Sequence, residues 1–112
     1  YQKKTEEKLK FMFKNCCTND YLTLLNGKLY RCPFSANTMN LKAIPIKDNE
    51  FIDLEKNLSK QELKNEMIDL YHKPEYLTAC NFCNGRDFTT PRIETAIQAK
   101  EPIIYEQVTD LE

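Results

Sequence analysis

Tyr21-Leu22-Thr23-Leu24-Leu25-Asn26-Gly27-Lys28-Leu29-Tyr30-Arg31-Cys32 is the stretch with the strongest structural signal in this chain. Asn26-Gly27 separates two runs rich in β-forming residues. This pair is typical of a two-residue hairpin, because a type I′ turn needs positive φ at both central positions. The hairpin predicted here pairs Leu24 with Leu29. Directly opposed residues share a face, so we expect Leu22, Leu24 and Leu29 to form one apolar face.

Two helices are predicted around the hairpin. Residues 2–14 carry apolar side chains at three- and four-residue intervals, which is typical of an amphipathic helix. Residues 59–72 begin with a capping-box pattern, in which Ser59 is the N-cap and Glu62 stands three residues later. Pro74 is expected to stop this second helix. Its predicted buried stripe consists of Leu63, Met67, Leu70 and Tyr71.

The remaining segments carry weaker signals. Residues 34–57 read mainly as loop, with at most one short strand around the apolar run 43–46. In the last part of the chain, residues 93–97 suggest a short helix and residues 103–105 a strand. We therefore expect a small α+β domain, in which a β-hairpin is followed by a helix.

Composition excludes several classes of protein. The 112 residues include 16 Lys plus Arg and 17 Asp plus Glu, so the net charge of −1 offers no basic surface for nucleic acid. No apolar run approaches the roughly 18 residues of a membrane span. Leu, Ile, Val and Phe together number 27, about 24% of the chain, which exceeds the roughly 20% that marks disorder. Because the sequence opens on Tyr1 without Met, we expect it to be part of a longer protein.

The five cysteines carry the chemistry. Five is an odd number and no signal peptide is seen, so we expect thiols in the cytoplasm in preference to a disulfide framework. Nine residues separate Cys17 from Gly27, and four more separate Gly27 from Cys32. Folding the hairpin brings these two cysteines together. Cys80 and Cys83 form a Cys-x2-Cys pair, so Cys17, Cys32, Cys80 and Cys83 are the predicted metal ligands, and the α+β domain is expected to be organised around this four-cysteine metal centre.

Zinc and an iron–sulfur cluster compete for such a site. Zinc ligands usually come in pairs separated by two to four residues, which the Cys80 pair satisfies and the Cys17 pair does not. Four thiolates at wider spacing suit an iron–sulfur cluster, which we favour. Cys16 is interpreted as a packing residue or spare thiol, although its ten-residue spacing to Gly27 also fits. A thiol redox role for the Cys80 pair is weaker, because no βαβ pattern surrounds it.

The combination Cys-x9-Gly-x4-Cys with a distant Cys-x2-Cys resembles the auxiliary-cluster domains of radical SAM enzymes, the SPASM domain and its shortened twitch form. The segment from Cys17 to Pro33 carries the resemblance. This segment is also loosely similar to predicted bacterial cluster-binding proteins. It implies a connecting helix at 1–14, a [4Fe-4S]-binding domain at 15–90 and a C-terminal tail at 91–112. Since no cysteine follows Cys83, the twitch form fits better than the full SPASM domain, which holds two clusters.

The resemblance also implies what the chain does. The cluster would relay electrons or position substrate beside a radical SAM barrel of the same polypeptide, and SAM would bind only in that barrel. The Cys-x3-Cys-x2-Cys motif of the SAM-binding cluster is absent from these residues, so we predict no catalytic residue and no radical chemistry by this part alone. The alternative is a zinc-stabilised structural or interaction module. Lys28, Arg31 and Arg86 are candidates to offset the cluster's negative charge, and Arg86 is predicted to be the cofactor-binding residue.

Overall fold

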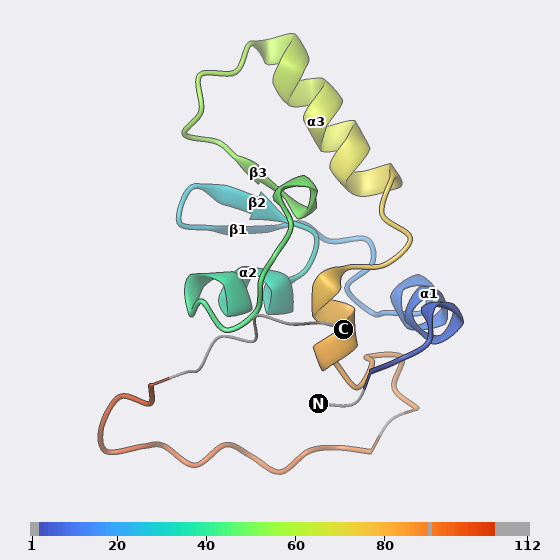
Figure 1. Cartoon of the computed structure of the whole chain (residues 1–112), viewed down its shortest axis with the longest axis vertical. Helices are drawn as coiled ribbons and strands as arrows, with labels where there is room; N and C mark the ends of the chain where they lie inside the picture. The colour runs from blue at the N-terminus through green and yellow to red at the C-terminus, as the bar shows by residue number, and fades with distance from the viewer. Residues whose placement is uncertain (1–2, 90, 105–112) are drawn as a thin grey trace.

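The computed structural model describes residues 3–89 and 91–104, and these form an α+β domain (Figure 1). Three helices accompany one three-stranded antiparallel sheet of order β1-β2-β3. In chain order the elements are α1 (Glu6–Lys14), β1 (Thr23–Leu25), β2 (Lys28–Tyr30), α2 (Pro33–Asn40), η1 (Asp48–Glu50), β3 (Phe51–Asp53), α3 (Lys60–His72) and η2 (Thr78–Phe82), where η marks a 3-10 turn.

The predicted hairpin is confirmed. Asn26 and Gly27 have φ values of 50° and 72°, the two positive values that a type I′ turn requires. Leu24 pairs with Leu29 and Leu25 with Lys28, as the two-residue loop dictates. The ladder ends at Tyr30, so the two strands are shorter than the stretch that predicted them.

The prediction that residues 34–57 are mainly loop is wrong. Helix α2 begins immediately after β2, with Cys32 as its N-cap and Pro33 in its first turn. Proline favours this position because its fixed φ suits a helix and its missing N–H has no intrahelical partner there. A third strand also forms, at Phe51–Asp53 and not at 43–46, and it pairs with β2 so that Ile52 lies opposite Leu29.

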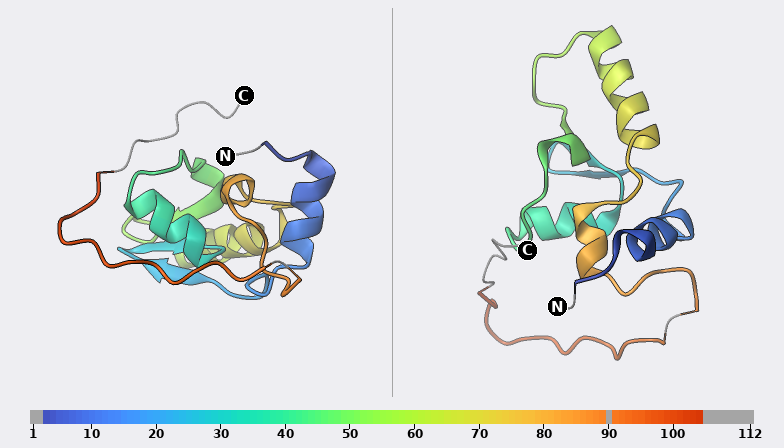
Figure 2. Two further views of the ribbon diagram at one scale, coloured as in Figure 1. Left: turned by 90° about the horizontal axis from the view of Figure 1, so that it is seen from below. Right: turned by 45° about the vertical axis from the view of Figure 1, so that its right-hand side comes forward.

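Helices α2 and α3 lie on opposite sides of the sheet, where α2 contacts β1 and β2 and α3 contacts β3 (Figures 1 and 2). Tyr30 is 3% exposed and its hydroxyl donates a hydrogen bond to Met39 Sδ of α2 at 3.1 Å. Its ring lies 5.7 Å from that of Phe51. The opposite face carries Leu24 and the buried Ile52, but Leu24 remains 64% exposed on the edge strand β1. The predicted apolar face is therefore only partly buried.

Helix α1 begins at Glu6 because Thr5 caps it, accepting a hydrogen bond from the Lys8 amide. Leu9 and Met12 are its buried residues, and the helix contacts η2.

Helix α3 begins as predicted, with Ser59 Oγ accepting from the Glu62 amide at 3.1 Å. The predicted buried stripe is wrong in extent, because only Leu70 is buried and Met67 and Tyr71 are more than a third exposed. The reason is visible in Figure 1, where the N-terminal end of α3 projects away from the sheet.

The predicted C-terminal elements do not form in the described part of the tail. Residues 91–104 contain neither helix nor strand, and every one of them is exposed. The predicted helix at 93–97 is wrong, since five residues cannot repay the cost of helix nucleation without a surface to pack on. Of the predicted strand, 103 and 104 are not in a strand and Tyr105 lies outside the described residues. Within the described ranges, no helix combines the length and the apolarity that crossing a membrane requires.

Candidate metal centre

The cysteines lie where three elements meet. Cys16 and Cys17 follow the end of α1, Cys32 caps the N-terminus of α2, and Cys80 and Cys83 lie within and at the end of η2. Both α1 and α2 contact η2, and the orange turn of η2 lies between these two helices in Figures 1 and 2. All five cysteines are half-buried free thiols. The fold therefore gathers thiols from distant parts of the sequence around η2.

Cys80 is the central thiol of this group. The pKa of Cys80 is raised to about 11, chiefly by burial; the backbone of Leu77 lowers it, and the thiols of Cys32, Cys83 and Cys16 make smaller contributions that raise it. Coulomb interactions weaken with distance, so these contributions indicate that thiols from the end of α1 and the start of α2 lie on the same side of the fold as η2.

The structure separates the roles of Cys16 and Cys17. Cys16 is among the thiols that act on Cys80, whereas Cys17 is not. The Cys17 amide instead donates a hydrogen bond to the Arg86 carbonyl at 2.9 Å, which fastens the end of α1 to the chain beyond Cys83. The Cys16 sulfur lies 3.1 Å from Thr18 Oγ1. The two adjacent cysteines therefore make different contacts, Cys16 through its sulfur and Cys17 through its amide.

Backbone amides already point at two of the sulfurs. The Ser35 amide donates to Cys32 Sγ at 3.2 Å, and the Gly85 amide donates to Cys83 Sγ at 3.4 Å. Hydrogen bonds to sulfur are one of the means by which proteins adjust thiolate-held clusters.

The thiols are gathered but do not enclose an ion site in this conformation. In the ranges 3–89 and 91–104, no group of three or more His, Cys, Asp or Glu side chains is arranged to hold a metal ion. The donor set nevertheless suits a thiophilic centre, since soft sulfur ligands select zinc, copper(I) or iron–sulfur clusters. Two buried side-chain atoms without a hydrogen-bond partner, Arg31 Nε and Ser35 Oγ, belong to residues that flank Cys32. Both atoms are donors, so an anionic group beside Cys32 fits this environment.

Positive charge near the thiols comes from residues with different degrees of burial. Arg31 is 3% exposed, and its guanidinium lies over the rings of Phe13 and Tyr71, at 5.4 and 4.6 Å from their centroids. Burial lowers the pKa of Arg31, although a guanidinium remains charged in proteins. Arg86, the predicted cofactor-binding residue, has an exposed side chain, and its described hydrogen bond uses the backbone carbonyl. By burial, Arg31 is the better placed cation.

The sequence does not identify two further residues, Lys4 and Glu50, that contact the η2 turn. Lys4 Nζ donates to the Asn81 carbonyl at 2.6 Å, which adds a cation beside the Cys80–Cys83 turn. Glu50 is 6% exposed, and its carboxylate accepts hydrogen bonds from the amides of Lys47 and Thr78. Because Thr78 begins η2, Glu50 fixes the turn that carries Cys80. Glu50 stands in the polar run 47–50, and nothing in that run indicates burial.

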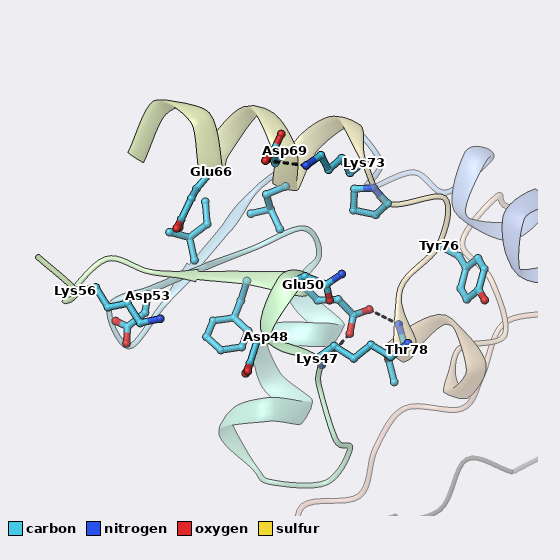
Figure 3. A pocket seen from close by; sticks show the side chains of 15 residues that line it. Lys47, Asp48, Glu50, Asp53, Lys56, Glu66, Asp69, Lys73, Tyr76 and Thr78 are labelled. Carbon is cyan, nitrogen blue, oxygen red and sulfur yellow. Dashed lines mark hydrogen bonds and ion pairs between the residues drawn. The ribbon is translucent and has the colours of Figure 1, made fainter. Parts of the chain in front are cut away.

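A separate groove of about 530 Å³ lies between β3 and α3 (Figure 3). Charged side chains of both signs line it, among them Lys56, Asp53 and Glu66, and Asp69 and Lys73 form an ion pair there at 3.0 Å. No cysteine is among its lining residues. The groove and the cysteines are therefore distinct features of the fold.

Comparison with known proteins finds no family model, no curated protein and no solved structure that matches this chain. The resemblance to twitch and SPASM domains therefore rests on the cysteine and glycine spacing alone.

Proposed function

We propose that this domain holds a [4Fe-4S] cluster and serves as an auxiliary cluster domain of a radical SAM enzyme. The proposed ligands are Cys32, Cys80, Cys83 and one member of the Cys16-Cys17 pair. The observation that carries the proposal is the meeting of three cysteine-bearing segments at η2, with three thiols acting on Cys80. Of the adjacent pair, we favour Cys16, because it is the one that acts on Cys80.

The ligand count supports electron relay over substrate positioning. Four protein thiolates leave no iron with an open position, so a substrate would have no iron to bind. When bound, the cluster supplies a one-electron carrier. The proposed partner is a radical SAM barrel of the same polypeptide, where SAM would bind. We place the protein in the cytoplasm, because free thiols of this density fit a reducing compartment.

A zinc-stabilised structural or interaction module is the second candidate. The two-residue separation of Cys80 and Cys83 falls in the range that zinc knuckles use, and four thiolates complete a tetrahedral zinc site. This candidate uses the same thiols, so the metal and not the residue set distinguishes the two functions.

Anaerobic reconstitution of the whole 112-residue chain with iron and sulfide tests the proposal. We expect the chain to take up iron and sulfide in equal amounts and to develop the broad visible absorbance of a cluster, reversibly bleached by dithionite. Parallel loading with zinc measures the competing site. A chain that binds one zinc tightly but never retains iron and sulfide would establish the second candidate and overturn the first.

The adjacent cysteines provide a matched pair of variants. We expect Cys16→Ser to abolish most cluster retention, whereas Cys17→Ser retains it, because Cys16 and not Cys17 is among the thiols that contribute to the raised pKa of Cys80. The opposite result would assign the ligand to Cys17, as its nine-residue spacing to Gly27 predicts. Equal retention in both variants would show that neither thiol is needed and would contradict a four-thiolate centre.

A further inference from the structure

Two buried polar atoms lack partners, and both belong to residues that flank Cys32. In the described ranges, Arg31 Nε and Ser35 Oγ are the buried side-chain nitrogen and oxygen atoms without a hydrogen bond. Leaving a buried donor unsatisfied is costly, so such atoms are rare and call for an explanation. In the chain, Arg31 directly precedes Cys32 and Ser35 follows it by three residues, in the first turn of α2.

Ser35 is the more informative of the two residues. It is completely buried at 0% exposure and lies in the first turn of α2. Its amide donates to Cys32 Sγ at 3.2 Å, and covalent geometry keeps its hydroxyl within a few ångströms of that amide. The hydroxyl therefore lies close to Cys32 without contacting any acceptor.

The same helix offers a contrasting hydroxyl. Thr38 is 7% exposed, and its Oγ1 lies 2.8 Å from the Phe34 carbonyl and 3.1 Å from the Ser35 carbonyl. A buried hydroxyl in α2 can thus be satisfied by the turn before it. Ser35 does not use this solution, so its hydroxyl stays available to another acceptor.

We propose that Ser35 is a positioning residue of the thiolate centre, and that its hydroxyl donates a hydrogen bond to a sulfur held at Cys32 when the centre is loaded. This inference rests on the proposed function, because it requires that a metal centre forms at the thiolates. The acceptor is either the Cys32 thiolate or a bridging sulfide beside it, both of which carry negative charge. Charge-assisted hydrogen bonds of this kind are about twice as strong as neutral ones.

The inference predicts that Ser35→Ala has opposite effects on the two forms of the protein. In the metal-free chain the substitution removes an unsatisfied hydroxyl, so the thermal midpoint is expected to stay constant or rise. In the loaded chain it removes a hydrogen bond, so the midpoint falls and a chelator strips the metal about 10-fold faster, within the range seen for groups that support metal ligands. Thr38→Val is the matched control, and it is expected to lower the midpoint of both forms alike.

A reduction potential provides a readout that packing alone would not move. A hydrogen bond to sulfur stabilises the more negative, reduced state, so its loss shifts the potential of the cluster to lower values. We expect this shift in Ser35→Ala, and we expect Ser35→Thr, which keeps the hydroxyl, to restore most of it. Thr38→Val is expected to leave the potential unchanged.

The possible outcomes separate this inference from the proposed function. A wild-type chain that binds neither iron and sulfide nor zinc would overturn both. If zinc binds instead, the comparison of midpoints and stripping rates is made on the zinc form, where Cys32 is still a thiolate. A chain that loads normally, but in which Ser35→Ala destabilises both forms equally and leaves the potential unchanged, would overturn the role of Ser35 alone and assign its hydroxyl to a buried water.

Discussion

Replacing Glu50 tests whether one buried carboxylate positions the turn that carries Cys80. In Glu50→Ala the amides of Lys47 and Thr78 both lose their acceptor. Lys47 is exposed, so water replaces the carboxylate there at little cost, but Thr78 is only 5% exposed. A buried donor without a partner costs about 1–3 kcal/mol, and hydrogen bonds to a charged group are at the upper end of such values. We therefore expect Glu50→Ala to lower the free energy of unfolding by about 3 kcal/mol.

The assay is unfolding of the metal-free chain, followed by circular dichroism. A loss of about 3 kcal/mol corresponds to a fall in the thermal midpoint of roughly 12–24 °C for a domain of this size. Glu50→Gln is expected to lose less, about 1 kcal/mol, because its amide oxygen can still accept from Thr78. Amide exchange at Thr78 should accelerate in Glu50→Ala, since that N–H loses its acceptor.

The exposed Glu66 provides the control for this series. It lies on the α3 side of the same groove (Figure 3), and Glu66→Gln is expected to change stability by less than about 0.5 kcal/mol. If Glu50→Ala were as neutral as this control, the carboxylate would not anchor η2, and the reasoning that links it to Cys80 would be refuted.

Three further substitutions test the scaffold by equilibrium unfolding. Gly27→Ala should lower the free energy of unfolding by about 1–2 kcal/mol, because Gly27 has φ of +72° and an added Cβ would meet Glu55 at 3.0 Å. An unchanged free energy of unfolding would contradict the type I′ turn. Leu70→Ala should lower the free energy of unfolding by about 2–5 kcal/mol, because Leu70 is buried. The control Ile68→Ala, at a site 47% exposed, should lower it by less than about 0.5 kcal/mol. Equal losses would mean that the face of α3 that carries Leu70 is not the one that packs on the sheet. Ser59→Ala should cost about 1 kcal/mol through loss of the N-cap, and no loss would mean that α3 begins elsewhere.

The elements that could be predicted are those that a short stretch of sequence determines by itself. The hairpin follows from Asn26-Gly27, whose backbone preferences determine both the turn and the register. The start of α3 follows from Ser59, whose side chain satisfies an amide three residues later. The start of α2 also had a local signal, because Pro33 directly after Cys32 fits the first turn of a helix. Cysteine is an unusual N-cap, and the sequence therefore shows no clear helix start at Cys32. For this reason Pro33 is interpreted from the sequence only as the end of the strand ladder.

Other features depend on contacts between distant parts of the chain. Strand β3 has three residues, and it is a strand because β2 offers it an edge to pair with. Burial of Glu50 depends on Thr78, 28 residues away. The choice between Cys16 and Cys17 depends on how α1 meets η2, and spacing to Gly27 fits either residue. The sequence identifies the cysteines, but the path of the chain decides which contacts each of the two adjacent residues makes.

The contacts that gather the thiols change the role expected for a metal. A small domain with few large apolar residues suggests that a metal is needed to hold it together. In this fold, however, η2 is held by bonds that involve no sulfur: Glu50 accepts from Thr78, and Leu77 is buried at 1% exposure. The Cys17 amide secures the end of α1 to Arg86 in the same way. The metal-free chain therefore has its own means of bringing the cysteine segments together. Loading would then close a centre whose parts are already assembled, and the energy of metal binding would add to folding without being a condition for it.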